Sequence, residues 1–195
     1  PCSAGTFGPD FGSDSVVHCL TTPSGTYSNA GSPAPIDCNA GTFNPLTGSS
    51  SESECLLAAP GNYSNSGSNQ PIPCLPGTFQ PESGKSSCFD AEPGFFVSIS
   101  GSVNQLACAK GTFQASSGSS TCINSEVGHY VSFEGSSNQT ACDAGKYNPQ
   151  VFTDDESYCL DVPDGYFSMR EDLSVLSNDS NSPSSVKLFF NFMRA

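Results

Sequence analysis

The chain has 195 residues, and its 19 Asp and Glu against 6 Lys and Arg give a formal net charge of -13. Leu, Ile, Val and Phe together supply only 38 of the residues. Few large apolar residues with a high net charge are typical of disorder, because little burial offsets the lost conformational entropy. The ten cysteines oppose that interpretation, since an even number of Cys among abundant Ser, Gly and Pro predicts a disulfide framework. We therefore expect a secreted protein or an extracellular surface protein.

The composition excludes two classes of function. Six basic residues on an acidic chain do not suit nucleic acid, whose binding depends on neutralising phosphates with Lys and Arg. No apolar run reaches the length of about 18 residues that suggests a membrane-spanning helix. The chain begins Pro1-Cys2 without Met, so we expect either that a leader has been removed or that this is a fragment of a longer protein.

The cysteines mark an internal repeat. Alternate cysteines recur with periods of 36, 36, 34 and 34 residues, and each opens a Cys-x-x-Gly phrase that ends in Thr-Phe or, in the last copy, Lys-Tyr. These cysteines are Cys2, Cys38, Cys74, Cys108 and Cys142. The second half of each unit carries a Gly-x-aromatic phrase without a neighbouring Cys. Each unit therefore contains two half-units of about 17 residues.

Each half-unit predicts one short, irregular hairpin. The Gly supplies a positive φ or a close backbone approach, and Thr-Phe favours extended structure. A turn of Ser, Gly, Asn and Pro follows, as at 44–48 or 80–84, and the chain then returns to the next Cys. One such hairpin is not stable alone, whereas stacked and disulfide-linked hairpins are. The predicted fold is a small disulfide-rich repeat, an elongated, β-poor, solenoid-like rod of short irregular hairpins in five units of 34–36 residues.

The repeat also predicts where one unit ends and the next begins. The predicted segments are repeat 1 (1–37), repeat 2 (38–73), repeat 3 (74–107), repeat 4 (108–141), the incomplete repeat 5 (142–168) and a divergent tail (169–195). Within the tail, 169–185 is polar and indicates a linker. The most apolar stretch of the chain follows, and its high β-propensity suits an assembly strand that pairs with a neighbouring molecule. The residues expected to form that strand are Val186, Leu188, Phe189, Phe190 and Phe192.

Two disulfide schemes pair neighbouring cysteines. One scheme pairs Cys2–Cys19, Cys38–Cys55, Cys74–Cys88, Cys108–Cys122 and Cys142–Cys159. The other is shifted by one and begins with Cys19–Cys38, which leaves Cys2 and Cys159 without a partner in this chain. We favour the first scheme because it pairs every Cys, although spacing alone does not decide the connectivity.

The phrase Cys-x-x-Gly-Thr-Phe-x-x-x-x-Gly-x-x-x-Cys, found from Cys74 to Cys88 and from Cys108 to Cys122, resembles the ephrin-receptor-like cysteine-rich repeat. That repeat is similar to the single-disulfide module of tumour necrosis factor receptor domains. The segment from Ala91 to Cys108 is also similar to tandem arrays of this kind, and the resemblance extends over residues 1–168. It implies an elongated extracellular rod with the first disulfide scheme and without catalysis.

The sequence has few features of a catalytic or metal-binding site. No Cys-x-x-Cys pair occurs, and His18 and His129 stand in different repeats without ligand spacing, so we expect no zinc site. The acidic run Asp154-Asp155-Glu156 does not form a calcium-binding loop motif and indicates a solvated loop. No motif places a nucleophile or a phosphate loop, so we expect neither an enzyme nor a cofactor.

Covalent glycans are the expected chemistry. Asn62, Asn138 and Asn178 each begin an Asn-x-Ser/Thr triplet, the acceptor of N-glycosylation. Asn69 and Asn104 stand in the slot equivalent to Asn138 but lack the hydroxyl residue, so the acceptor is not a property of the repeat. The triplets can also arise by chance in a chain rich in Asn and Ser.

These observations leave two classes of function. The near-identical repeats favour a structural extracellular protein, the self-associating protomer of a glycosylated filament, surface coat or stalk. The alternative is a ligand-binding segment of a cell-surface receptor or adhesin ectodomain. For that alternative, we expect the ligand at the irregular insert from Phe11 to Val17, inside the first of the longer disulfide loops.

Overall fold

The computed structural model describes residues 1–8, 19–163, 166–168 and 192–194. Its elements within these ranges are very short strands and two 3-10 helices, η2 (Glu52–Glu54) and η3 (Glu156–Tyr158). The strands are β1 (Thr6–Phe7), β2 (Leu20–Thr21), β3 (Thr26–Tyr27), β4 (Ile36–Asp37), β5 (Thr42–Phe43), β6 (Leu56–Leu57), β7 (Asn62–Tyr63), β8 (Ile72–Pro73), β9 (Thr78–Phe79), β10 (Phe89–Asp90), β11 (Phe95–Phe96), β12 (Leu106–Ala107), β13 (Thr112–Phe113), β14 (Ile123–Asn124), β15 (His129–Tyr130), β16 (Thr140–Ala141), β17 (Lys146–Tyr147), β18 (Leu160–Asp161), β19 (Tyr166–Ser168) and β20 (Phe192–Arg194).

Each strand pairs with one neighbour in a two-stranded sheet, β1 with β2, β3 with β4 and so on to β19 with β20. The β5–β6 hairpin shows how the repeated phrase builds this unit. Thr42 Oγ1 donates to the backbone oxygen of Asn39 at 2.7 Å, which closes the turn before the strand. Phe43 then lies opposite Leu56 in antiparallel register. The predicted small disulfide-rich fold of short hairpins is confirmed.

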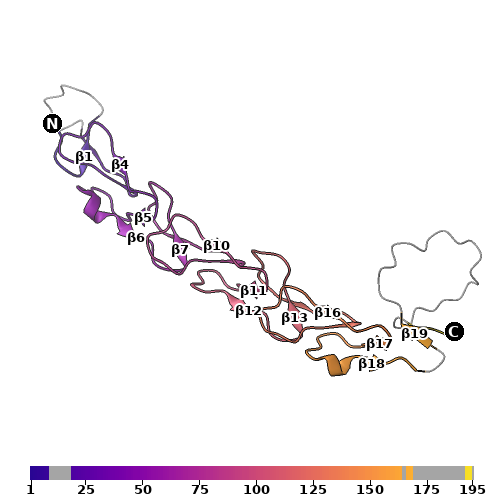
Figure 1. The fold of residues 1–195 in the computed structure, drawn as a ribbon. Coiled ribbons are helices and arrows are strands. Elements are labelled where there is room, and N and C mark those ends of the chain that lie inside the picture. Colours follow the sequence, from indigo (N-terminus) through magenta and orange to yellow (C-terminus); the bar gives the residue numbers. More distant parts are fainter. Residues whose placement is uncertain (9–18, 164–165, 169–191, 195) are drawn as a thin grey trace, which may run out of the picture. The chain divides into compact units, whose positions relative to one another are not determined.

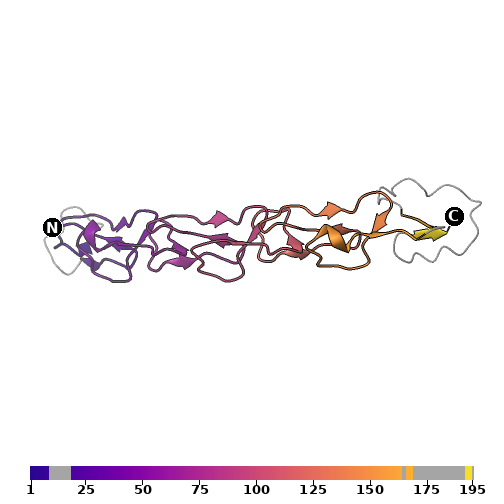
Figure 2. The same cartoon turned by 60° about the horizontal axis from the view of Figure 1, so that its bottom comes forward.

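The described residues cluster into two compact units. Unit 1 contains 1–91, 97–106 and 118–120, and unit 2 contains 92–96, 107–117 and the residues from 121 onward. Unit 1 includes the hairpins from β1–β2 to β9–β10, which follow one another in chain order (Figure 1). Unit 2 includes the hairpins from β13–β14 to β17–β18, which also follow one another in chain order (Figures 1 and 2).

Backbone hydrogen bonds connect successive hairpins in unit 1. The N–H of Gly25, before β3, donates to the oxygen of Asn44, after β5, at 2.7 Å. The N–H of Gly67, in the β7–β8 loop, donates at 3.0 Å to the oxygen of Cys38, after β4. Each hairpin therefore bonds to the next one and also to the one after that. These bonds join main-chain groups, so they do not depend on the identity of the turn side chains.

The same ladder recurs in unit 2. Gly111 N–H donates to Val131 O at 2.9 Å, and Gly128 N–H donates to Asn148 O at 2.8 Å. The return bond runs from Gly135 N–H to Cys108 O at 2.8 Å. The two units are thus built by one rule.

The interior contains cysteines, small residues and polar side chains. Cys38, Cys74 and Cys108 are fully buried, as are Ala58 and Ala91. The larger buried groups include Val97 and Val131 and a set of amides at the position after each Thr-Phe or Lys-Tyr strand from the second repeat onward, namely Asn44, Gln80, Gln114 and Asn148. The sequence identifies these positions as turns, and the structure shows that the turns are closed around a buried amide.

Gln80 illustrates how such an amide closes its turn. Its Nε2 donates to the backbone oxygen of Ser87 at 2.8 Å, and its Oε1 accepts from the N–H of Glu82 at 3.0 Å. Gln114 makes the matching pair of bonds in its own turn, with Thr121 and Ser116. The side chain thereby satisfies main-chain groups that the short strands leave unpaired.

The tail contributes one strand to the described residues. Phe192 of β20 lies opposite Ser168 of β19 in antiparallel register. Of the residues expected in an assembly strand, only Phe192 is described, and its strand pairs within this chain; Val186, Leu188, Phe189 and Phe190 lie outside the described residues. The division into five repeats and a tail, and the elongated shape of the whole chain, remain predictions.

Candidate ligand-binding site

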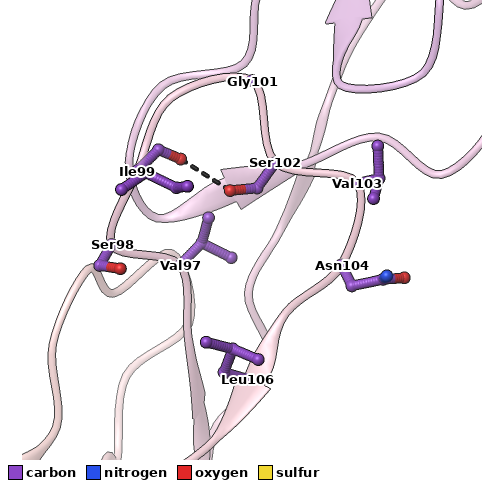
Figure 3. Close-up of a pocket in the computed structure, with 8 residues that line it drawn as sticks. All are labelled: Val97, Ser98, Ile99, Gly101, Ser102, Val103, Asn104 and Leu106. Carbon is purple, nitrogen blue, oxygen red and sulfur yellow. Dashed lines mark hydrogen bonds between the residues drawn. The ribbon is translucent and has the colours of Figure 1, made fainter.

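A shallow apolar pocket of about 350 Å³ opens in the loop between β11 and β12. Its lining residues all belong to unit 1, and Figure 3 shows them around the turn at Gly101. The apolar ones are Val97, Ile99, Val103 and Leu106, and the polar ones include Ser98, Ser102 and Asn104. This volume lies at the lower end of the range of about 300–1,000 Å³ for small-molecule sites. The pocket is open to the surface rather than an enclosed cavity.

Backbone contacts fix the shape of this loop. The N–H of Gly101 donates to the oxygen of Cys74 at 2.8 Å, and the oxygen of Ser102 accepts from the N–H of Gln80 at 3.1 Å. Across the turn itself, Ser102 Oγ donates to Ile99 O at 2.8 Å (Figure 3). The apolar side chains are thus presented on a loop that is bonded to the neighbouring hairpins.

The loop differs from its counterparts earlier in the chain. Val97 is buried, yet Ile99 is 68% exposed at the tip of the turn. The glycines on the two sides of this loop, Gly94 and Gly101, are seven positions apart. In the corresponding loop of the preceding repeat, Gly61 and Gly67 are six positions apart. The longer loop recurs in the next repeat, where Phe133 is 76% exposed. The corresponding signal in the sequence is the Cys–Cys gap of 20 residues in place of 19.

The pocket has no ionisable side chain among its lining residues. Among the described residues of the chain, no three His, Cys, Asp or Glu side chains form a group that could hold a metal ion. An uncharged, partly apolar pocket can bind a side chain by burial and by hydrogen bonds to groups such as the Ser98 and Ser102 hydroxyls.

A second apolar feature repeats along both units. The residue after the second Cys of each disulfide is apolar and about half exposed, and it lies opposite the aromatic residue of the phrase, as Ile123 lies opposite Phe113. These residues are Leu20, Leu56, Phe89, Ile123 and Leu160. In the β9–β10 hairpin, the ring centroids of Phe79 and Phe89 are 6.0 Å apart. Such cross-strand pairs stabilise the short hairpins. This role is sufficient to explain why apolar residues stand at these half-exposed positions, and no ligand needs to be invoked.

The cysteines are all described and all bonded. The disulfides are Cys2–Cys19, Cys38–Cys55, Cys74–Cys88, Cys108–Cys122 and Cys142–Cys159. These are the pairs of the first scheme. Closure of loops of 14 to 17 residues constrains the unfolded chain by roughly 3 kcal/mol each in the chain-entropy account.

The acidic run 154–156 has a structural role. Asp155 caps the 3-10 helix η3, with its Oδ1 accepting from the N–H of Ser157 at 2.8 Å. That hydrogen bond lowers the pKa of the Asp155 carboxyl. Glu156 Oε1 lies 3.8 Å from the ammonium of Lys146. These contacts agree with a solvated loop held by local bonds.

The remaining expected sites are distributed as follows. His129 Nδ1 lies 3.1 Å from the backbone oxygen of Val127, in a contact within its own turn. Asn62 lies in β7, and Asn138 lies in the loop before β16. His18, the insert from Phe11 to Val17, and Asn178 lie outside the described residues.

Comparison with known families locates the resemblance. Residues 61–108 match the family model described as tyrosine-protein kinase ephrin type A/B receptor-like. This segment is similar to the ephrin-receptor-like cysteine-rich repeat. The resemblance drawn from the Cys-x-x-Gly-Thr-Phe phrase is thereby confirmed, and the ephrin-receptor-like segment contains the whole pocket. No curated protein matches the chain.

Among the described residues, no helix is both long and apolar enough to cross a bilayer.

Proposed function

We propose that the chain is a non-catalytic segment of the extracellular part of a cell-surface receptor or adhesin. The observation that carries this proposal is the ephrin-receptor-like repeat at 61–108. It favours the receptor alternative over the filament or coat protomer that the near-identical repeats suggested. The disulfides further support an oxidising, extracellular setting.

We further propose that the pocket in the β11–β12 loop contacts a protein ligand. The loop is longer than its counterparts in the first two repeats, and binding sites in repeat proteins commonly occur on variant loops. Ile99 and Leu106 are exposed beside a concavity, and burial of one apolar side chain there would contribute roughly 1.5–3 kcal/mol. A modest contact of this size suits a receptor whose affinity comes from several contacts.

The test uses the secreted, disulfide-bonded chain, biotinylated and tetramerised on streptavidin, as a probe of intact cells from the source organism. We expect saturable binding that Ile99→Asp reduces at least fivefold. The matched control is Leu46→Asp, because Leu46 is 60% exposed in the β5–β6 hairpin of the same unit. Equal binding by the two variants would overturn the assignment of the pocket, and the absence of saturable binding would overturn the receptor proposal.

Negative-stain microscopy of the same material separates the two classes of function. A receptor segment remains monomeric at high concentration. Regular filaments would instead support the filament protomer and contradict the proposal.

A further inference from the structure

Two Asn-x-Ser/Thr triplets are described, and the hairpins place them differently. Asn62 lies in β7, where its Nδ2 donates to the oxygen of Pro60 at 3.2 Å and to that of Ala59 at 3.4 Å. The hydroxyl residue of that triplet, Ser64, is fully buried. Asn62 thus has the same role in the β7–β8 hairpin as Thr42 has in the β5–β6 hairpin, where Thr42 Oγ1 closes the turn by donating to a backbone oxygen. A sugar on this nitrogen would stand against those two carbonyl groups.

The second triplet faces solvent. Asn138 and Thr140 are both exposed, and Thr140 is the first residue of β16. Between them, Gln139 is bound to Glu126, with Nε2 donating to Oε2 at 3.0 Å and Oε1 accepting from the N–H of Glu126 at 2.8 Å. The Gln139 contact fixes the backbone of the triplet at the surface, and the side chains of Asn138 and Thr140 on either side of it remain exposed.

We propose that Asn138 carries an N-linked oligosaccharide and that Asn62 does not. The sugar donor is a lipid diphosphate-linked oligosaccharide of the secretory pathway. The Asn138 Nδ2 forms a bond to the anomeric carbon, the bond from that carbon to the diphosphate oxygen breaks, the lipid diphosphate leaves, and the amide loses one proton. The proposal rests on the extracellular location proposed above, and it does not depend on the ligand or on the pocket.

The repeat offers a matched control at the equivalent position of the preceding unit. Asn104 is exposed and is followed by Gln105, but Leu106 stands where Asn138 has its Thr140. Leu106→Thr therefore creates the same triplet in the same structural slot. Thr140→Ala removes the natural acceptor while leaving Asn138 in place.

The experiment secretes the full chain from a eukaryotic cell behind a supplied signal sequence and maps glycopeptides by mass spectrometry before and after enzymatic release of N-glycans. We expect most copies to be modified at position 138, loss of that glycan in Thr140→Ala, and a second glycan in Leu106→Thr. An unmodified Asn138 in secreted, disulfide-bonded protein would overturn the proposal. Comparable modification of Asn62 would overturn its second half.

The outcome is separate from that of the cell-binding test. Because the signal sequence is supplied, failure to find a ligand leaves the glycan result intact. Equally, an unmodified Asn138 leaves the binding result intact.

Discussion

The backbone of Gly41 lies directly against the carbonyl group of Gly84, two hairpins further along the chain. Gly41 has φ of 88°, and a Cβ at this position would overlap the Gly84 oxygen. The same relationship joins Gly25 to Gly67. At Gly41 and Gly25, the Gly is therefore required both for its left-handed backbone and for a contact that no side chain permits.

Gly41→Ala is expected to destabilise the chain by more than the strain of a positive φ alone, which is about 1–2 kcal/mol. The additional loss comes from displacement of the Gly84 backbone. Gly31→Ala is the control, because Gly31 has φ of 77° but its nearest contact from a Cβ is Pro1 Cβ at 3.8 Å. Thermal unfolding under oxidising conditions measures the difference. Equal losses of stability in the two variants would show that backbone strain alone accounts for the effect of Gly41→Ala, and that the contact with Gly84 adds nothing.

The sequence was sufficient to predict the hairpins, because Gly, Thr and an aromatic residue act locally. The stacking of each hairpin on the second one beyond it was not predictable, since the bonds join main-chain groups such as Gly67 N–H and Cys38 O. The pocket was also missed, although the extra residue before Gly101 was visible in the Cys spacing. The burial of polar residues such as Gln80 was also not predictable, because a hydrophobicity pattern identifies only apolar buried positions.

Gln80→Met is expected to cost about 1–3 kcal/mol for each main-chain group that it leaves unpaired. The substitution keeps a long side chain at a position that is 1% exposed, but it removes the bonds to Ser87 and Glu82. Chemical denaturation of both proteins at the same redox poise gives the loss. Gln70→Met, at an exposed position, is expected to leave stability unchanged. A Gln80 variant as stable as the parent would contradict a closing role for the buried amide.

Two buried hydroxyls of the β3–β4 region predict opposite effects. Ser28 Oγ is fully buried and has no hydrogen-bond partner among the described atoms, whereas Thr26 Oγ1 donates to Pro23 O at 2.8 Å. Ser28→Ala is therefore expected to leave the free energy of unfolding unchanged or to raise it. Thr26→Val is expected to lower it by about 1 kcal/mol. The equivalent of Ser28 in the third repeat is the apolar Val97, which is also buried. Calorimetry of the two variants tests this, and a marked loss in Ser28→Ala would contradict it.

Acid is expected to weaken the disulfide loop of the second repeat. The N–H and the hydroxyl of Ser50 both donate to Glu54 Oε1, at 2.8 and 2.9 Å, and the backbone bond is the main reason that the Glu54 pKa is lower than its usual 4.5. A carboxyl with a lowered pKa stabilises the fold above its unfolded pKa, and the effect disappears as the pH falls through its folded pKa. We therefore expect the midpoint temperature of thermal unfolding to decrease once the pH is below about 4.5, the usual Glu pKa. Midpoints measured from neutral pH to pH 3 test this.

Glu54→Gln is the matched variant for this titration. It cannot ionise, so its midpoint should change less between neutral and acidic pH than that of the parent. Ser50→Ala, which removes one donor to Glu54, should give an intermediate slope. Parallel curves for the parent and both variants would exclude Glu54 as a source of the acid sensitivity.

Non-reducing peptide mapping tests the disulfide scheme directly. Digestion between the cysteines should recover Cys38 linked to Cys55 and Cys74 linked to Cys88. Each pair should separate on reduction. A peptide joining Cys19 to Cys38 would instead support the shifted scheme.

The two lengths of disulfide loop differ at one place only. The Cys38–Cys55 loop spans 17 residues and contains η2, whereas the Cys74–Cys88 loop spans 14. In both, the first glycine and the turn glycine are seven positions apart, so the extra turn lies between the turn glycine and the second Cys. Lengthening a loop by this amount costs only tenths of a kcal/mol in closure entropy. The stretch before the second Cys is thus a natural graft point, where a foreign peptide epitope could be displayed in several copies along one chain.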